Sequence, residues 1–182
     1  MKRLALLALC LLASLNSIFA IDIDTLTTNH PEYLPTLQIG TAAPDIVAND
    51  TIGTEIKLSS FRGQYVILDF WATWCGDCRR ETPALKELFA KEEYKTIAGK
   101  AVQWIGFSFD DNAQSWKNYL TKNQLPWPQI SNLLRTRQDP TFKAYELHWI
   151  PAFFIIDPEG KIAGKAITAL GLEGELVRIQ AQ

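Results

Sequence analysis

The stretch that determines the fold of this chain is residues 65–78, which read YVILDFWATWCGDC. Residues 65–72 form a continuous apolar run interrupted only by Asp69, and such a run predicts a buried β-strand. The segment 77–94 carries apolar residues at helical spacing and predicts an α-helix. The two cysteines of this stretch therefore lie between the end of a buried strand and the start of a helix.

The position of the cysteine pair indicates a reactive thiol. Backbone N–H groups at a helix start lack partners within the helix and, together with the helix dipole, favour an anion. The thiolate of Cys75 would be that anion, and its pKa is expected below the value of about 8.5 for free cysteine. Cys78 follows one helical turn later on the same face. One thiol can attack and the other resolve, as thiol–disulfide exchange requires.

A C-x-x-C pair taken alone can also be half of a zinc site. A structural zinc site needs four ligands, usually completed by a second Cys or His pair. The chain offers only His30 and His148, which stand far apart as single residues. The sequence therefore disfavours zinc, and we expect no metal or other cofactor at the cysteines.

The composition is that of an ordinary globular protein. The chain has 182 residues, is 47% hydrophobic and 21% charged, and carries 18 Lys and Arg against 20 Asp and Glu. One compact domain is expected at this length. The formal net charge of -2 gives no reason to expect a nucleic-acid partner, because phosphate binding needs clustered excess Lys and Arg.

The beginning of the chain has the plan of a secretory signal peptide. Two basic residues precede an apolar or small-residue run over residues 4–15, and Ala20 offers a small residue for cleavage. The run is shorter than the roughly 20 apolar residues of a spanning helix, although residues 18–21 could extend it into an uncleaved anchor. We therefore expect an exported protein with a cleaved leader.

Cleavage would leave Cys75 and Cys78 as the only cysteines, because Cys10 lies within the leader. Cross-linking two cysteines three residues apart closes a small loop and adds little stability. Redox chemistry therefore explains the pair better than a disulfide scaffold does. The expected organisation is a signal peptide over residues 1–20, a linker or arm over 21–38, and one domain over 39–182.

Outside the central stretch, the hydrophobic pattern predicts a mixed sheet. We expect a β-hairpin within residues 43–58, strands at 101–109, 152–157 and 161–167, helices at 112–123 and 172–180, and a short helix near Phe142 in the mixed segment 130–145. The order is βαβα followed by ββα. The first strands should pair in parallel through crossover helices and the last two should be antiparallel, which makes the fold class α/β.

The residues around the cysteines closely resemble the thioredoxin active site, with DFWATWCGDC at 69–78 and Pro83 five residues later. The surrounding chain resembles the exported TlpA/ResA-type branch, with GTAAPD at 40–45, LSSFRG at 58–63, Glu81, and IPAFFIIDPEGK at 150–161. This resemblance covers residues 38–180. It implies a thioredoxin-like fold, in which helices flank a central mixed β-sheet and a β-hairpin forms an N-terminal extension.

The resemblance also implies roles for the cysteines and for two carboxylates. Cys75 would be the nucleophile and Cys78 the resolving thiol. Asp69 matches the buried carboxylate that handles a proton for the resolving cysteine, and a carboxylate within an apolar strand is costly unless it is paired, exposed or protonated. Glu81 matches the second carboxylate of the branch, although it could equally be a solvated helix residue that pairs with a nearby Arg or Lys.

The rim of the site follows from the same resemblance. The bond before Pro151 would be cis, and this proline would pack against the sulfurs and present the backbone of Ile150 to a bound peptide. Asp77 stands where a proline is common and Trp149 where a glycine is common, which leaves the substrate open. The expected substrate-binding residues are Trp74, Gly76, Asp77, Trp149, Ile150 and Pro151.

His148 keeps a metal-binding alternative open. It lies three residues before Pro151 and therefore close to the cysteines. Cys75, Cys78 and His148 could form a copper site resembling that of the Sco class, since sulfur and imidazole suit copper. Sco proteins carry C-x-x-x-C rather than C-x-x-C, and a loop histidine with no ligand role is the simpler interpretation.

The expected function is that of an exported thiol-disulfide oxidoreductase of the bacterial periplasm. Asp69, Asp77 and Glu81 would place negative charge near Cys75 and limit stabilisation of its thiolate, which favours a reductant or a weak oxidant. The resemblance implies a membrane-embedded electron-relay protein as donor. It implies exported proteins with oxidised cysteines, such as apocytochrome c, as acceptors.

Overall fold

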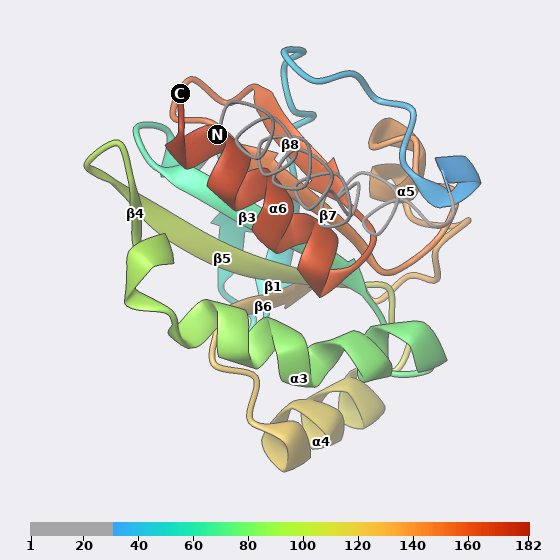
Figure 1. Ribbon diagram of the computed structural model, residues 1–182. Coiled ribbons are helices and arrows are strands. Elements are labelled where there is room, and N and C mark those ends of the chain that lie inside the picture. The colour runs from blue at the N-terminus through green and yellow to red at the C-terminus, as the bar shows by residue number, and fades with distance from the viewer. Residues whose placement is uncertain (1–30) are drawn as a thin grey trace, which may run out of the picture.

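The computed structural model describes residues 31–182, which form a mixed sheet with helices on both faces (Figure 1). The strands are β1 (Val47–Asp50), β2 (Glu55–Lys57), β3 (Tyr65–Trp71), β4 (Thr96–Ile97), β5 (Lys100–Ser108), β6 (Gln129–Ser131), β7 (Ala152–Ile156) and β8 (Ile162–Ala166). The α-helices are α3 (Gly76–Ala90), α4 (Ala113–Asn123), α5 (Pro140–Ala144) and α6 (Ala169–Gln180). Short 3-10 turns are η1 (Pro31–Tyr33), η2 (Leu58–Phe61) and η3 (Glu92–Tyr94).

The strand order across the sheet is β2-β1-β6-β5-β3-β7-β8, and β4 pairs with β5 outside this path. β3, β5 and β6 are parallel, whereas β7 is antiparallel to β3 and β8 is antiparallel to β7. The β1–β2 hairpin extends the other edge, antiparallel to β6. The predicted thioredoxin-like α/β fold, its N-terminal hairpin and the change from parallel to antiparallel pairing are confirmed.

Four segments differ from the expectation drawn from sequence, and the first is the two-residue strand β4, which was not expected. β6 lies in the segment that was expected to be mixed, and its three residues are too few to show a periodicity. α6 begins at Ala169 rather than Leu172, because the hydroxyl of Thr168 accepts the Gly171 N–H and caps the helix there. α3 ends at Ala90, and the separate turn η3 follows it.

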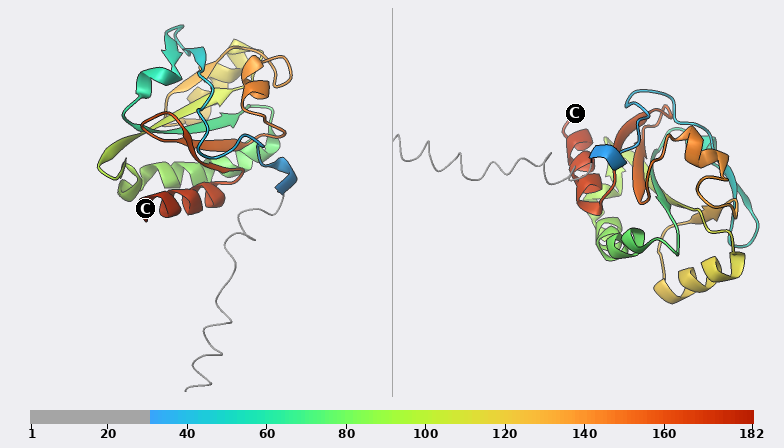
Figure 2. Two further views of the ribbon diagram at one scale, coloured as in Figure 1. Left: turned by 90° about the horizontal axis from the view of Figure 1, so that it is seen from above. Right: turned by 90° about the vertical axis from the view of Figure 1, so that its right-hand side faces the viewer.

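Two apolar cores hold the helices against the sheet. On one face, Leu85 of α3 and Leu176 of α6 pack in the same cluster as Ile67 of β3. On the other face, Trp116 of α4 packs in a cluster with Phe70. Figure 2 shows α3 and α6 together on one side of the sheet, with α4 and α5 on the opposite side. The sheet is therefore buried between two layers, which explains its nearly continuous apolar strands.

An irregular arm, residues 31–42, leads into the domain along β8. The Lys165 ammonium donates to the carbonyl oxygens of Pro35 at 2.5 Å and Leu37 at 3.1 Å. The backbone N–H of Gly40 donates to the Ile162 carbonyl at 2.7 Å. The part of the predicted arm that the structure describes is therefore tied to the domain by hydrogen bonds.

The predicted signal peptide, residues 1–20, and the first ten residues of the predicted linker lie outside the described residues. Within residues 31–182, no helix has the length and apolarity needed to cross a membrane. The division of the chain into signal peptide, linker and domain stays a prediction.

Candidate active site

The cysteine pair lies between the end of β3 and the start of α3, as the sequence predicted. Cys75 is the N-cap residue of α3 and Cys78 lies in its first turn, and a disulfide joins them. The backbone N–H of Cys78 donates to Cys75 Sγ at 3.1 Å. One of the free N–H groups of the helix start therefore points at this sulfur, which is the position where it would stabilise a thiolate.

The Ile150–Pro151 peptide bond is cis, as expected. β7 begins at the next residue and pairs with β3, so that Ala152 lies opposite Phe70. This register brings the segment before β7 next to the loop that follows β3. The carbonyl oxygen of Ile150 lies 3.4 Å from Cys75 Sγ, and Ile150 itself is buried. The backbone before the proline is therefore in contact with the outer sulfur of the pair.

Asp69 is a buried carboxyl group, and only 3% of its surface is exposed. It follows Ile67 by two residues on β3 and therefore points toward the face that α3 and α6 cover. Its Oδ1 has no hydrogen-bond partner among the described residues. Burial raises the pKa of Asp69 to about 7, and the indole N–H of Trp127 opposes this rise without forming a hydrogen bond of normal geometry. A carboxyl group that titrates near neutral pH is suited to proton transfer.

Glu81 has a partner that the sequence did not indicate. Its Oε2 accepts the backbone N–H of Ala169 at 2.7 Å, at the start of α6. No ion pair between Glu81 and an Arg or Lys occurs in the described part of the chain. Glu81 and Pro151 both line a second cavity of about 300 Å³. The carboxylate is thus held near the cis proline by the N-terminal end of another helix.

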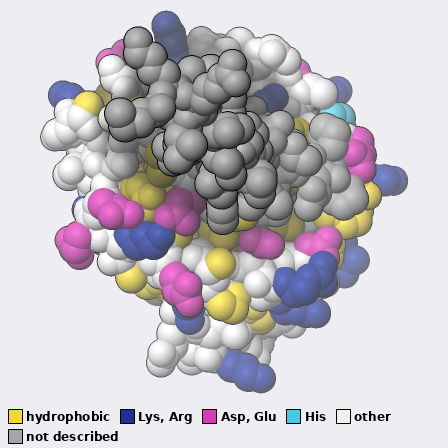
Figure 3. Space-filling model, viewed as in Figure 1, with side chains coloured by type: hydrophobic (Ala, Val, Ile, Leu, Met, Phe, Trp, Pro, Cys, Tyr) yellow, Lys and Arg dark blue, Asp and Glu magenta, His cyan; other side chains and the backbone are white. Residues whose placement is uncertain are grey.

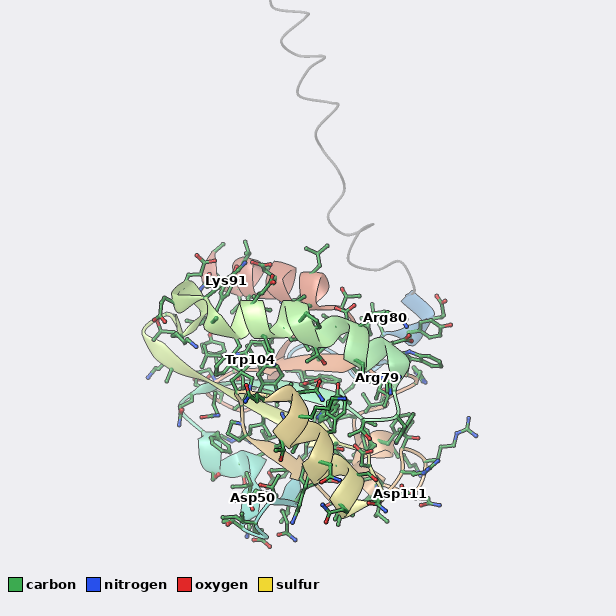
Figure 4. The ribbon with its side chains drawn as sticks, turned by 90° about the horizontal axis from the view of Figure 1, so that it is seen from below. Asp50, Arg79, Arg80, Lys91, Trp104 and Asp111 are labelled. Carbon is green, nitrogen blue, oxygen red and sulfur yellow. A yellow bond between two sulfur atoms is a disulfide. The ribbon has the colours of Figure 1, made fainter. Side chains whose placement is uncertain are left out.

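Asp77 and Trp149 form one polar contact at the rim. The indole N–H of Trp149 donates to Asp77 Oδ2 at 3.1 Å, and Asp77 Oδ1 is paired with Arg80. The ring of Tyr33 stacks on Trp149 with 5.0 Å between centroids. Figure 4 shows Arg79 and Arg80 together at the end of α3 that carries the cysteines. The two residues that depart from the family pattern therefore contact each other, and the arm reaches this rim through Tyr33.

A cavity of about 410 Å³ opens beside Cys75. Its wall includes five of the predicted substrate-binding residues, Trp74, Gly76, Asp77, Trp149 and Ile150. Pro151 lines the neighbouring cavity instead, with Asp77 and Trp149 shared between the two. Trp74 and Trp149 are 45% and 44% exposed, so large apolar surfaces are open to solvent at this rim. Such exposed aromatic surface is typical of a binding site.

His148 also lines the cavity beside Cys75. The structure therefore places Cys75 and His148 on the wall of one cavity, which Cys78 does not line. Among residues 31–182, no group of three or more His, Cys, Asp and Glu side chains is arranged to hold a metal ion.

Asp110 is a site residue that the sequence analysis missed. It is 3% exposed, and it accepts hydrogen bonds from the Thr73 N–H at 2.9 Å, the Thr73 hydroxyl at 2.5 Å and the Ser108 hydroxyl at 2.6 Å. These bonds fasten the loop before Cys75 to the end of β5. A signal was present, because β3 and β5 are parallel and their carboxyl ends meet at one edge, where Thr73 and Asp110 follow them.

A second missed group lines the same cavity. Thr136 and Arg137 lie in the loop between β6 and α5, and Phe142 lies in α5. Their contribution depends on β6, which brings this loop beside β5 and which the sequence did not predict. No motif marks these residues in the sequence.

Comparison with known proteins agrees with this geometry. Residues 39–165 match the model of the AhpC/TSA family. The thiol-disulfide oxidoreductase ResA of Bacillus cereus is 34% identical over 146 residues, which is 79% of each chain, and ResA of Bacillus subtilis is 30% identical over 129 residues, which is 71% of this chain and 66% of that one.

Solved structures give the same result. A thiol-disulfide oxidoreductase from Bacteroides fragilis has a TM-score of 0.66 at 28% identity, covering 76% of this chain and 98% of that one. A thiol:disulfide interchange protein from Bacteroides sp. has a TM-score of 0.65 at 29% identity, covering 80% and 92%. The chain therefore belongs to the AhpC/TSA family and is a thioredoxin-like thiol-disulfide oxidoreductase with a Cys-x-x-Cys pair, similar to ResA.

Proposed function

We propose that this enzyme is exported and reduces disulfides of other exported proteins, with Cys75 as the attacking thiol and Cys78 as the resolving thiol. The observation that carries this assignment is the unequal access of the two sulfurs. Cys75 lines the cavity, whereas Cys78 lines neither this cavity nor the neighbouring one and is 3% exposed. A substrate disulfide that enters the cavity can therefore reach Cys75 first.

The reaction then proceeds by two exchanges. The Cys75 thiolate attacks one sulfur of the substrate disulfide, the substrate S–S bond breaks, and a mixed disulfide forms while the second substrate sulfur leaves as a thiolate and takes up a proton. Cys78 loses its proton and attacks Cys75 Sγ, which releases the remaining substrate thiolate and closes the Cys75–Cys78 disulfide. Two electrons pass from the enzyme to the substrate, and a separate donor must return them.

Asp69 is proposed to accept the proton of Cys78. Its pKa of about 7 means that a large fraction is ionised at neutral pH and can act as a base. Glu81 is proposed as the second carboxylate, positioned by the Ala169 N–H. The rim residues Trp74, Gly76, Asp77, Trp149, Ile150 and Pro151 are proposed to contact the substrate.

Burial of the sulfurs favours a reductant over a strong oxidant. Cys75 and Cys78 are 7% and 3% exposed, and apolar burial disfavours a thiolate, whereas a strong oxidant needs a stabilised thiolate. The negative charge near Cys75 that the sequence indicated is a weaker argument for a reductant. Asp77 is paired with Arg80, and Asp69 is partly protonated at neutral pH.

Export and the partners rest on the sequence and on the family resemblance. The leader-like residues 1–20 support export to the periplasm, and an exported reductase needs a membrane-embedded electron-relay protein as its donor. Exported proteins with oxidised cysteines, such as apocytochrome c, are the proposed acceptors. Nucleic acid is not a proposed partner, since the net charge is -2 and acidic and basic side chains lie next to one another on the face shown in Figure 3.

The cysteine roles are tested by trapping. Cys78→Ser should accumulate mixed disulfides on Cys75, whereas Cys75→Ser should abolish exchange. Exchange that survives Cys75→Ser would overturn the assignment.

The direction of electron flow is tested by equilibrating residues 21–182 in defined thiol–disulfide buffers and measuring the oxidised fraction by alkylation and mass. A cooperative two-electron transition at low potential supports a reductase, and one at high potential contradicts it. Bound copper that protects both thiols would instead favour the metal-binding alternative with His148.

A further inference from the structure

The residues that line the cavity beside Cys75 are of two kinds. Trp74, Phe142 and Trp149 contribute apolar surface, and Thr136, Arg137 and His148 are polar or charged. A substrate held next to Cys75 therefore meets both apolar surface and hydrogen-bond donors.

The hydrogen-bond donors among these lining residues are unused within the described part of the protein. Arg137 and His148 are exposed, and neither they nor Thr136 form a side-chain hydrogen bond or ion pair with residues 31–182. Neighbouring arginines are engaged, because Arg79 donates to the Thr73 carbonyl at 2.9 Å and Arg135 binds Asp111. Arg137 is thus a cation that lines the cavity and has no hydrogen-bond or ion-pair partner among residues 31–182.

The loop that carries Arg137 is fastened on both sides. Before it, the Arg135 guanidinium binds Asp111 Oδ2 at 2.7 Å, and Asp111 lies near the start of α4, as labelled in Figure 4. After it, the buried Asp139 caps α5 by accepting the Thr141 N–H at 2.8 Å and also accepts from Asn132 at 3.1 Å. The backbone that presents Arg137 is therefore held in place before a ligand arrives, which reduces the entropy lost on binding.

Negative charge in the same wall is already compensated. Asp77 lines the cavity, but its two carboxylate oxygens are engaged by Arg80 and by the Trp149 indole. The uncompensated charge of the cavity is therefore positive. It comes from Arg137.

We propose that this cavity contains a subsite for a carboxylate carried close to the reactive sulfur of the substrate, with Arg137 as its ion-pairing ligand and Thr136 and His148 as hydrogen-bond donors. This inference rests on the proposed function and adds a substrate class to it. Guanidinium groups bind carboxylates through paired hydrogen bonds, so Arg137 suits this ligand geometrically as well as electrostatically. The carboxylate can belong to an acidic residue of a protein or to a small disulfide with free carboxyl groups.

The test compares disulfide peptides that have blocked termini and differ only in Glu or Gln beside the cysteine. For the wild-type protein we expect kcat/KM to be about tenfold higher for the Glu peptide, since a charge-assisted hydrogen bond supports a preference of that order. Arg137→Gln should reduce this ratio to about twofold or less. Lys143→Gln is the matched control, because Lys143 is exposed on α5 outside the cavity and its loss changes the net charge equally.

A second substrate pair identifies the source of the carboxylate. Glutathione disulfide is compared with its carboxyl-esterified form in the same assay. A preference confined to the Glu peptide indicates a protein substrate, and a preference confined to the free glutathione disulfide indicates a small one. Equal rates within both pairs for wild type, or a preference that Lys143→Gln removes as fully as Arg137→Gln, would overturn the subsite.

A binding measurement separates this inference from the proposed reductase activity. Glu and Gln peptides whose cysteines are replaced by serine are titrated into the oxidised protein, where no exchange can occur, and binding is followed by calorimetry. Tighter binding of the Glu peptide that is lost in Arg137→Gln supports the subsite even if the protein proves to be an oxidant. Equal binding of both peptides contradicts it even if the protein reduces both disulfides.

Discussion

Asp69 and Asp110 are two carboxyl groups with the same exposed fraction, 3%, on neighbouring parallel strands or directly after them. Asp110 accepts three hydrogen bonds from Thr73 and Ser108. Asp69 has an oxygen with no hydrogen-bond partner in the described part of the chain, and its pKa is raised to about 7. The two carboxyl groups are therefore equally buried but differ in their hydrogen bonding, because hydrogen-bond donors surround only Asp110.

The difference shows how two neighbouring strands can carry one carboxyl group that stabilises the site and one that is available for chemistry. The satisfied carboxylate holds the loop that carries the cysteines. The unsatisfied one stays near its titration point and is available for proton transfer. Substitution of Asp110 should therefore lower the stability of the fold, and Asp69→Asn should slow thiol–disulfide exchange at neutral pH.

The largest expected effect is a pH dependence of stability that belongs to Asp69. The folded-state pKa of about 7 lies above the ordinary value of 3.8, so the folded protein holds a proton that the unfolded chain has already released. The stability from this group is complete below pH 4 and is lost as pH rises through 7. Relative to Asp69→Asn, the wild type should lose roughly 4 kcal/mol in free energy of unfolding between pH 4 and pH 9. Urea denaturation of both oxidised proteins across this range measures the difference, and parallel pH profiles would contradict it.

Removal of the satisfied carboxylate should cost stability. Asp110→Ala leaves the Thr73 N–H and two hydroxyls without their acceptor and should lower the free energy of unfolding by about 3 kcal/mol. The control is Asp111→Ala, which removes an exposed ion pair with Arg135 and should cost less than about 1 kcal/mol. Equal losses in the two variants would mean that Asp110 does not fasten the loop.

Asp69→Asn should impair the second exchange step while leaving the fold intact at neutral pH. Loss of a proton acceptor lowers a rate by about 10²-fold, equivalent to about 2.7 kcal/mol. Stopped-flow measurement of mixed-disulfide release, with a preformed adduct on Cys75, isolates this step. In the wild type its rate should increase as pH rises through 7. An Asp111→Asn control should keep the wild-type rate, and an Asp69→Asn variant that also keeps it would remove Asp69 from the mechanism.

The central parts of the site were predictable because they are continuous in sequence. The run of residues 65–78 specifies a strand, a reactive pair and a helix start within one local pattern, and the cis Pro151 followed from a resemblance over a similarly short motif. Asp69 was identifiable because a single carboxylate interrupts an apolar strand. Its missing partner required the structure.

The contribution of Thr136 and Arg137 to the cavity was not predictable, because it depends on contacts between distant segments. Arg137 lines the same cavity as Cys75 because the three-residue strand β6 pairs with β5 and brings the following loop to the site. A strand of three residues is too short to produce a periodic pattern. Glu81 illustrates the same limit, since its partner is a backbone N–H of the last helix. Tyr33 stacks on Trp149 although the two residues are far apart in the sequence. Tyr33 belongs to an arm that the sequence indicated only as irregular.

The smallest predicted effect concerns the one group that lowers the pKa of Asp69. The indole N–H of Trp127 opposes the effect of burial, so Trp127→Phe should raise the pKa of Asp69 further. The matched control is Trp116→Phe, because Trp116 is equally buried and packs in the cluster on the other face of the sheet. Its indole nitrogen also has no hydrogen-bond partner within residues 31–182. Carboxyl ¹³C shifts of Asp69 against pH measure both variants. A downward shift of the pKa of Asp69 in Trp127→Phe would show that the Trp127 indole does not lower it. An equal shift in Trp116→Phe would show that the effect is not specific to Trp127.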